Sequence, residues 1–121
     1  MASNISSLLQ TSVAVITFPR RRPKEGFSAM RRMVCTNAAA LLNSMQGRMV
    51  LNYRPTTGAP KYNPGKYSLL LAWDILMQNY RMINLQGINI EREIPIDEFW
   101  EYFEKELSPL TTQSKLAFMN A

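Results

Sequence analysis

The sequence predicts a small single-domain α+β fold in which two or three β-strands pack against three or four helices. Three observations predict this class. The chain has 121 residues, enough for one hydrophobic core. Segments with helical spacing of apolar residues alternate with shorter segments of strand-like alternation. The net charge of +5 is concentrated near the N-terminus, which sets a first segment apart from the rest.

The composition indicates a globular chain, because 46% of the residues are hydrophobic and 19% are charged. The longest apolar stretch runs from Leu69 to Met77 and contains Asp74. It is shorter than the roughly 20 residues that a bilayer-spanning helix needs. The sequence therefore predicts no transmembrane segment.

Residues 1–35 differ from the rest in charge and composition. They hold six of the 14 basic residues and one of the nine acidic residues, and no charged side chain precedes Arg20. The stretch before that point is rich in small and hydroxylated residues. This order resembles a chloroplast transit peptide. We therefore expect residues 1–35 to be a disordered targeting segment that is removed near Cys35, and residues 36–121 to form the α+β domain.

Three other interpretations of the basic segment stay open. A mitochondrial presequence would carry arginines in its first turns, and a lumen-directed leader would need a longer apolar stretch than residues 38–42. A retained basic arm would bind nucleic acid through its arginines. The favoured location is the chloroplast stroma or the stromal side of the thylakoid, with peripheral membrane association included, and the mitochondrion is the alternative.

The domain begins with a predicted helix over residues 37–46, ended by Gly47, and a predicted strand over residues 48–54. Residues 55–66 contain three prolines and predict a loop. A central helix is predicted over residues 68–80, because apolar residues fall on one helical face. Those residues are Leu69, Ala72, Trp73, Leu76 and Tyr80.

The remaining elements are a strand and two helices. Residues 82–90 predict one extended strand with a bulge at Gly87, and a tight turn at the same glycine is the alternative. Residues 97–107 predict an amphipathic helix with Asp97 as N-cap. A last helix is predicted over residues 110–119.

The chain offers few groups for catalysis. Histidine is absent, the one cysteine is Cys35, and no glycine-rich phosphate loop occurs. The sequence therefore predicts a protein that is not an enzyme and has no catalytic residues, cofactor site or metal site.

The predicted helix over residues 68–80 is apolar around most of its circumference, and a small domain cannot easily cover it. We therefore expect a non-catalytic accessory or assembly factor, or a small subunit, of a chloroplast multiprotein complex. The complex could be one of photosynthetic electron transport. A homo-oligomer would also cover the apolar surface. The predicted partner-binding residues are Tyr62, Tyr67, Trp73, Met77, Tyr80, Trp100 and Tyr102.

The alternative function is RNA binding in organelle gene expression. Residues 48–67 mix basic and aromatic side chains, which suits phosphate contact and base stacking. The zero net charge of residues 36–121 argues against this alternative if the first 35 residues are removed.

Overall fold

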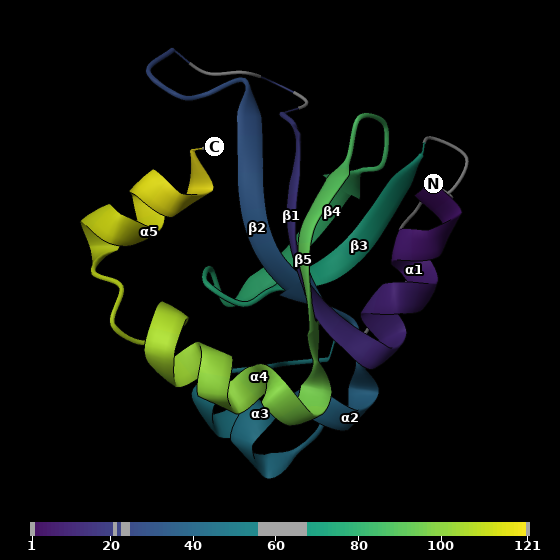
Figure 1. Cartoon of the computed structure of the whole chain (residues 1–121), viewed down its shortest axis with the longest axis vertical. Coiled ribbons are helices and arrows are strands. Elements are labelled where there is room, and N and C mark those ends of the chain that lie inside the picture. The colour runs from purple at the N-terminus through teal and green to yellow at the C-terminus, as the bar shows by residue number, and fades with distance from the viewer. Residues whose placement is uncertain (1, 21, 23–24, 56–67, 121) are drawn as a thin grey trace.

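The structure, a computed structural model, describes residues 2–20, 22, 25–55 and 68–120. Its centre is a five-stranded antiparallel sheet in the order β4-β3-β2-β1-β5 (Figure 1). The α+β class is confirmed, but the expectation of two or three strands is wrong. The strands are β1 (Ser12–Pro19), β2 (Met30–Thr36), β3 (Leu69–Asp74), β4 (Asn79–Asn84) and β5 (Asn89–Pro95).

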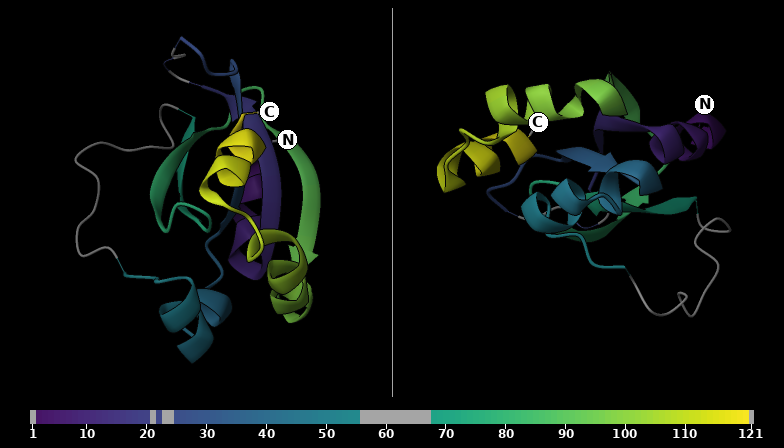
Figure 2. Two further views of the ribbon diagram at one scale, coloured as in Figure 1. Left: turned by 90° about the vertical axis from the view of Figure 1, so that its left-hand side faces the viewer. Right: turned by 90° about the horizontal axis from the view of Figure 1, so that it is seen from below.

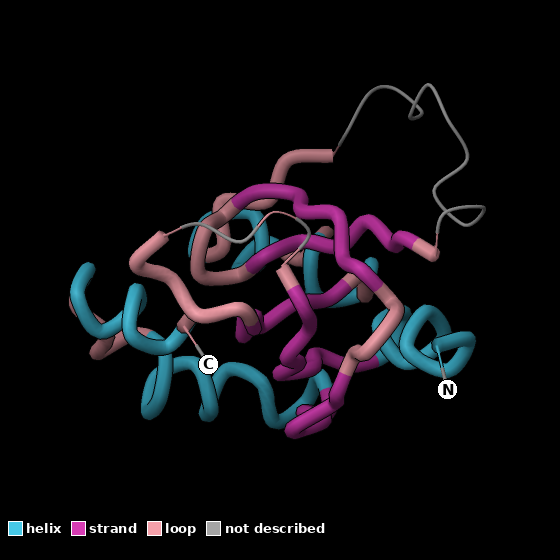
Figure 3. Tube along the Cα trace, turned by 90° about the horizontal axis from the view of Figure 1, so that it is seen from above, coloured by secondary structure: helices cyan, strands magenta, loops and turns pink. Residues whose placement is uncertain are grey.

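Helices surround the sheet. Seen from above, the strands gather in the centre, with α1 on one side and the C-terminal helices on the other (Figure 3). Seen from below, α4 and α5 lie on one side of the molecule and α2 and α3 on the other (Figure 2, right). The helices are α1 (Ala2–Thr11), α2 (Ala39–Leu42), α3 (Met45–Val50), α4 (Ile96–Tyr102) and α5 (Thr112–Met119), and α4 continues as a π-helical segment, η2 (Phe103–Leu107).

Strand β1 is an interior strand of the sheet and contributes to both hydrophobic cores. It pairs with β2 along one edge and with β5 along the other. Its sequence is rich in β-branched residues and is buried on both faces: Val13 and Val15 face one core, and Ala14, Ile16 and Phe18 face the other. A strand buried on both faces has a continuous apolar sequence rather than an alternating one.

The expectation of a disordered N-terminal segment is wrong. Residues assigned to that segment form α1, β1 and most of β2, the secondary structure at the middle of the fold. The buried Thr36 hydroxyl fixes this region, because it donates to the carbonyl oxygens of Ser12 (2.8 Å) and Leu9 (3.3 Å) and accepts from the Ala38 amide (3.0 Å). Cleavage near Cys35 would delete β1 and all of β2 except Thr36.

The sheet separates two hydrophobic cores. The first is closed by the helices after β2 and β5, which contribute Leu41, Leu42 and Phe99 to pack on Trp73. The second is closed by α1 and includes the residues Ile5, Leu9, Ala14, Ile16, Phe18, Met33, Cys35, Ala72 and Ile83. Because only residues 85–88 join the two edge strands β4 and β5, the sheet curls and brings its edges toward each other.

The predicted helix over residues 68–80 is wrong, because this segment forms β3, a turn and β4. Trp73 pairs with Tyr80 across the two strands, and their rings meet edge to face with centroids 5.1 Å apart. The apolar residues that suggested a helical face are split between the two sides of the sheet, with Ala72 in one core and Trp73 in the other. A short apolar run is compatible with the spacing of a helix and with that of a buried strand, and tertiary packing decides between the two.

Two further expectations need correction. The predicted strand over residues 48–54 is wrong, because α3 occupies residues up to Val50. The predicted bulged strand over residues 82–90 is divided by a turn in which Gly87 has φ +74°, so β4 and β5 are separate strands at opposite edges of the sheet. The bulge lies instead where β5 pairs with Val15 and Ile16.

The amphipathic helix predicted over residues 97–107 is confirmed as α4 and η2. Its apolar stripe faces the first core through Phe99 and Leu107. The expected N-cap at Asp97 is wrong, because the cap position is Pro95, and Asp97 lies in the first turn.

Removal of residues 1–35 should abolish folding, because it deletes β1 and nearly all of β2 and opens both cores. We expect residues 36–121 alone to give a disordered circular dichroism spectrum without a cooperative thermal transition, while the full chain melts cooperatively. A cooperative transition of the truncated chain would contradict the fold and would agree with a removable leader.

Gly47 lies where α3 approaches α2 too closely for a side chain. A Cβ at this position would lie 2.1 Å from the carbonyl oxygen of Leu41 and 2.9 Å from that of Leu42. Gly47→Ala should therefore lower the free energy of unfolding by about 1–3 kcal/mol in urea denaturation. Met49→Ala on the same helix is the matched control and should change it by less than about 0.5 kcal/mol, because that side chain is exposed. Equal effects of the two variants would contradict this close approach.

Candidate functional site

Charge is separated along the molecule. Residues 91–106, in β5, α4 and η2, hold seven of the nine acidic residues and only two of the 14 basic residues. The connection between β1 and β2 and the adjoining strand ends carry a run of arginines. In Figure 1 this connection lies at the top of the molecule and α4 at the bottom. The protein therefore presents a basic end and an acidic end.

The basic end contains a hollow of about 720 Å³, which we call the arginine cleft. Its lining comes from β1, the β1–β2 connection and β2 on one side, and from β4 on the other. The lining residues are Phe18, Arg20, Arg22, Phe27, Arg31, Tyr80, Arg81 and Met82.

The cleft exists because the strand pairs on its two sides diverge. Strands β2 and β3 pair at only two positions, Cys35 with Asp74 and Thr36 with Trp73, whereas β1 and β2 pair along their whole length. Alternation along β2 places Arg31 on the same face as Met33 and Cys35, which belong to the second core. The arginine cleft is therefore the polar continuation of that core.

Asp74 is the acidic partner of two cleft arginines. Its Oδ2 lies 2.7 Å from Nη2 of Arg31 and 3.7 Å from Nε of Arg81, and its Oδ1 accepts the Met77 amide at 3.1 Å. Burial raises the pKa of Asp74, and the Met77 amide and the two guanidinium groups oppose that shift. Burial likewise lowers the pKa of Arg31, and the neighbouring Arg81 charge lowers it further. One carboxylate thus lies between two guanidinium groups and leaves positive charge in excess.

Arg20 is held at the rim of the cleft by three contacts. Its Nε donates to the Ser28 carbonyl at 2.8 Å, and its Nη2 donates to Oδ1 of Asn120 at 2.8 Å. Its guanidinium also lies 5.4 Å from the centroid of the Phe27 ring. Phe27 is exposed although it is large and apolar. The rim therefore presents a positioned cation beside an accessible aromatic ring, the combination that nucleic-acid surfaces use.

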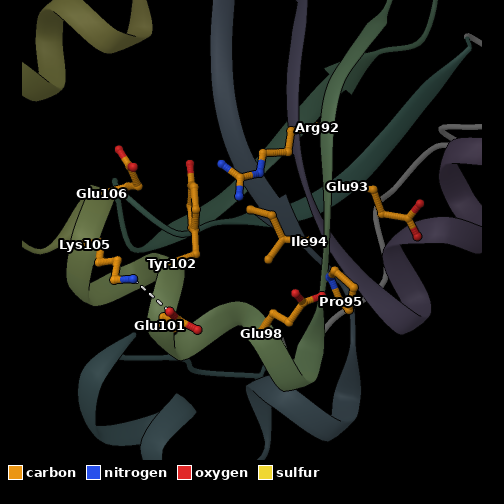
Figure 4. A pocket seen from close by; sticks show the side chains of 9 residues that line it. All are labelled: Arg92, Glu93, Ile94, Pro95, Glu98, Glu101, Tyr102, Lys105 and Glu106. Carbon is orange, nitrogen blue, oxygen red and sulfur yellow. Dashed lines mark hydrogen bonds and ion pairs between the residues drawn. The ribbon is translucent and has the colours of Figure 1, made fainter.

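A second, smaller hollow of about 290 Å³ lies between β5 and the α4–η2 helix. Figure 4 shows Arg92 and Tyr102 side by side in it; the guanidinium is 4.8 Å from the ring centroid. Lys105 and Glu101 form an exposed ion pair at 2.8 Å. Arg92 and Tyr102 are partners across β5 and α4, and Lys105 and Glu101 are partners along one helix. Exposed pairs of this kind are the ordinary arrangement of a solvated charged face.

The described residues include few side chains that could act as a nucleophile or bind a metal ion. Cys35 is fully buried in the second core, and burial raises the pKa of its thiol far above the ordinary value. A buried neutral thiol is a poor nucleophile. Within the ranges that the structure describes, no group of three or more His, Cys, Asp or Glu side chains could hold a metal ion.

The sequence-predicted partner residues on β3 and β4 have different environments. Trp73 is only 2% exposed and is part of the first core. Tyr80 packs against Trp73, and its hydroxyl lies 2.7 Å from that of Tyr53, in hydrogen-bond contact. Met77 is exposed in the turn between the two strands. Only Tyr80 among them also lines the arginine cleft.

Trp100 and Tyr102 do not line the cleft. Trp100 and Tyr102 are half-buried on α4 and pack against the first core. Tyr62 and Tyr67 lie outside the described residues. The predicted partner residues that the structure describes therefore do not form one surface, because Trp73 is buried and only Tyr80 among them lines the arginine cleft.

The interpretation of residues 1–35 as a removable leader excludes Arg20, Arg22 and Arg31 from any predicted site. Two β-branched or apolar runs, residues 12–18 and 33–36, flank the basic stretch, and this pattern indicates a strand, a basic connection and a second strand. Arg81 had no comparable signal, because its approach to Arg31 depends on the tertiary fold.

Comparisons with protein-family models, curated proteins and solved structures find no match to this chain. Among the described residues, no helix is long and apolar enough to cross a membrane.

Proposed function

We propose that this protein is a non-catalytic nucleic-acid-binding domain that holds the phosphate backbone in the arginine cleft. The observation that carries the proposal is the convergence of four arginines in one hollow: Arg20, Arg22, Arg31 and Arg81. Asp74 is the acidic group beside them and is already shared by two of them. Guanidinium groups bind phosphate oxygens through paired N–H donors, and phosphate contacts supply most of the affinity of nucleic-acid binders.

The charge separation supports the same function. The acidic surface formed by residues 91–106 repels a polyanion, while the arginine cleft at the other end attracts it. Such a field steers a charged ligand toward one end of the protein. A binding orientation is therefore built into the charge distribution.

This proposal keeps the RNA-binding alternative derived from the sequence but moves it to different residues. Residues 48–55 form the end of α3 and the start of a connection, and residues 56–67 lie outside the described ranges. The arginines that carry the proposal come from residues 20–31 and from β4. The plastid location stays a prediction. It was based on a leader outside the folded domain, and residues 1–35 instead form α1, β1 and most of β2.

Binding should depend on salt and on the cleft arginines. We expect the full chain to bind fluorescent 20-mers of T or U in an anisotropy titration, with a slope of log K against log salt of about −2 to −3, since each phosphate contact on a single strand contributes roughly −0.7. Arg22→Gln should weaken binding about threefold to tenfold and make the slope less steep by roughly 0.7.

The matched control for Arg22→Gln is Lys115→Gln, because Lys115 is a half-exposed cation on α5 that does not line the cleft. Its affinity and salt slope should stay close to those of the unmodified protein. Equal losses in both variants would indicate binding by general charge and would contradict a cleft. Absence of measurable affinity at low salt would reject the proposed function.

One observation favours a second candidate function, the accessory or assembly role predicted from the sequence. Helix α3 exposes Met45 (78%), Met49 (76%) and Val50 (41%), an apolar group on one short helix. Methionine-rich surfaces adapt to protein partners. This surface differs from the apolar helix that the sequence predicted over residues 68–80.

The two candidate functions are separable by a double substitution on α3. Met45→Ser with Met49→Ser should leave nucleic-acid affinity unchanged, because neither residue lines the cleft. If α3 mediates self-association, this variant should shift the mass measured by light scattering from oligomer to monomer. A monomeric unmodified protein that retains no partner in crosslinking from its native cells would reject the assembly role.

A further inference from the structure

Two guanidinium nitrogens in the arginine cleft lack acceptors. Nε of Arg31 and Nε of Arg81 are buried, and neither has a hydrogen-bond partner among the described residues. The Arg31 side chain is only 9% exposed, and its Nη2 is already engaged with Asp74. Arg81 Nε faces the same carboxylate, but at 3.7 Å, too far for a hydrogen bond. Both residues line the same hollow.

This arrangement is costly for a protein without a ligand. A buried donor without an acceptor destabilises the folded state, and native proteins leave few of them. The charges are also unbalanced, because one buried carboxylate faces two guanidinium groups and Arg20 adds a third charge nearby. An anion in the cleft would supply acceptors for the free donors and balance the charge at once.

We propose that the arginine cleft contains a phosphate subsite, in which phosphate oxygens accept hydrogen bonds from Nε of Arg31 and Nε of Arg81 while Asp74 keeps the two guanidinium groups in place. The identification of this phosphate with one group of a nucleic-acid backbone rests on the proposed function. The subsite itself rests only on the donor geometry and the charge of the cleft.

A phosphate suits this position better than a carboxylate. The two donors come from different strands, β2 and β4, and an acceptor with anionic oxygens in several directions can accept from both at once. A phosphate group has such oxygens, and arginine side chains match its geometry in paired contacts. The volume of about 720 Å³ also leaves room for the nucleoside attached to the phosphate.

The test uses the full chain and inorganic phosphate. Thermal unfolding is followed at constant ionic strength while phosphate replaces chloride. We expect phosphate to raise the midpoint temperature in a saturable manner, because a ligand that binds only the folded state stabilises it. Arg81→Gln should weaken phosphate binding about tenfold or more, since hydrogen bonds to charged groups are the strong ones.

Two further variants distinguish phosphate binding at this subsite from phosphate binding by overall positive charge. Arg81→Lys keeps the charge but lacks the Nε donor, and it should also lose most of the phosphate effect. Arg48→Gln removes an exposed arginine on α3 outside the cleft and should retain that effect in full. Arg31 is left unchanged, because its loss would leave Asp74 buried with only the more distant Arg81.

The outcomes distinguish the subsite from the proposed function. Phosphate stabilisation that is lost in both Arg81 variants supports the subsite, and competition between phosphate and the T 20-mer identifies the backbone as its source. Oligonucleotide binding without any phosphate effect would overturn the subsite and leave the proposed function standing. Phosphate stabilisation without oligonucleotide affinity would overturn the proposed function and assign the subsite to a free phosphate ester. If phosphate raises the midpoint temperature of neither the unmodified protein nor its variants, the subsite is overturned.

Discussion

The buried ion pair between Asp74 and Arg31 is the interaction on which the arrangement of the two strand pairs depends. Strands β2 and β3 share only two paired positions, so the sheet has little backbone connection at its middle. Asp74, at the end of β3, restores that connection by a 2.7 Å contact to Arg31 in β2 and a longer one to Arg81 in β4. Removing one member of such a buried pair typically costs about 3–5 kcal/mol. The same three side chains therefore hold the sheet together and leave an excess of positive charge at its open end.

Stability and binding make opposite demands on this cluster. A second carboxylate would balance the charge and satisfy the free Nε donors, but it would also repel a polyanion. The acidic residues are instead concentrated in β5, α4 and η2, and none of them lines the cleft, although Glu91 of β5 pairs with Arg32 of β2 at 3.0 Å outside it. The amphipathic α4–η2 helix can carry so many carboxylates because its other side packs on the first core, with Phe99 and Leu107 as its buried residues. The helix that completes the first core thus also defines the acidic end of the molecule.

The predictable part of the fold is the part in which one face is buried and the other is solvated. Helix α4 satisfies that condition, and its stripe from Phe99 to Leu107 reveals its period. Strand β3 does not, because Ala72 and Trp73 are buried in different cores, so the apolar run fits a helix as well as a strand. Strand β1 has the same ambiguity, and the arginines that follow it give the segment the composition of a targeting peptide. The candidate site was unpredictable because Arg31 and Arg81 converge only after the sheet has curled.

The C-terminal segment explains how long, flexible arginine side chains can have fixed positions. Helix α5 has no buried residue, yet its end is attached to β2 where β3 has turned away: Asn120 bridges to Arg31 and accepts from Arg20, and the Phe118 carbonyl accepts from Arg32. These contacts already restrict the side-chain rotamers in the free protein. Binding therefore avoids part of the ordering cost, which is about 0.5–1.5 kcal/mol for each flexible side chain. The value of α5 therefore lies less in hydrophobic burial than in preorganising the basic end. A helix with almost no core of its own is retained in the fold because its last residues complete the open edge of β2.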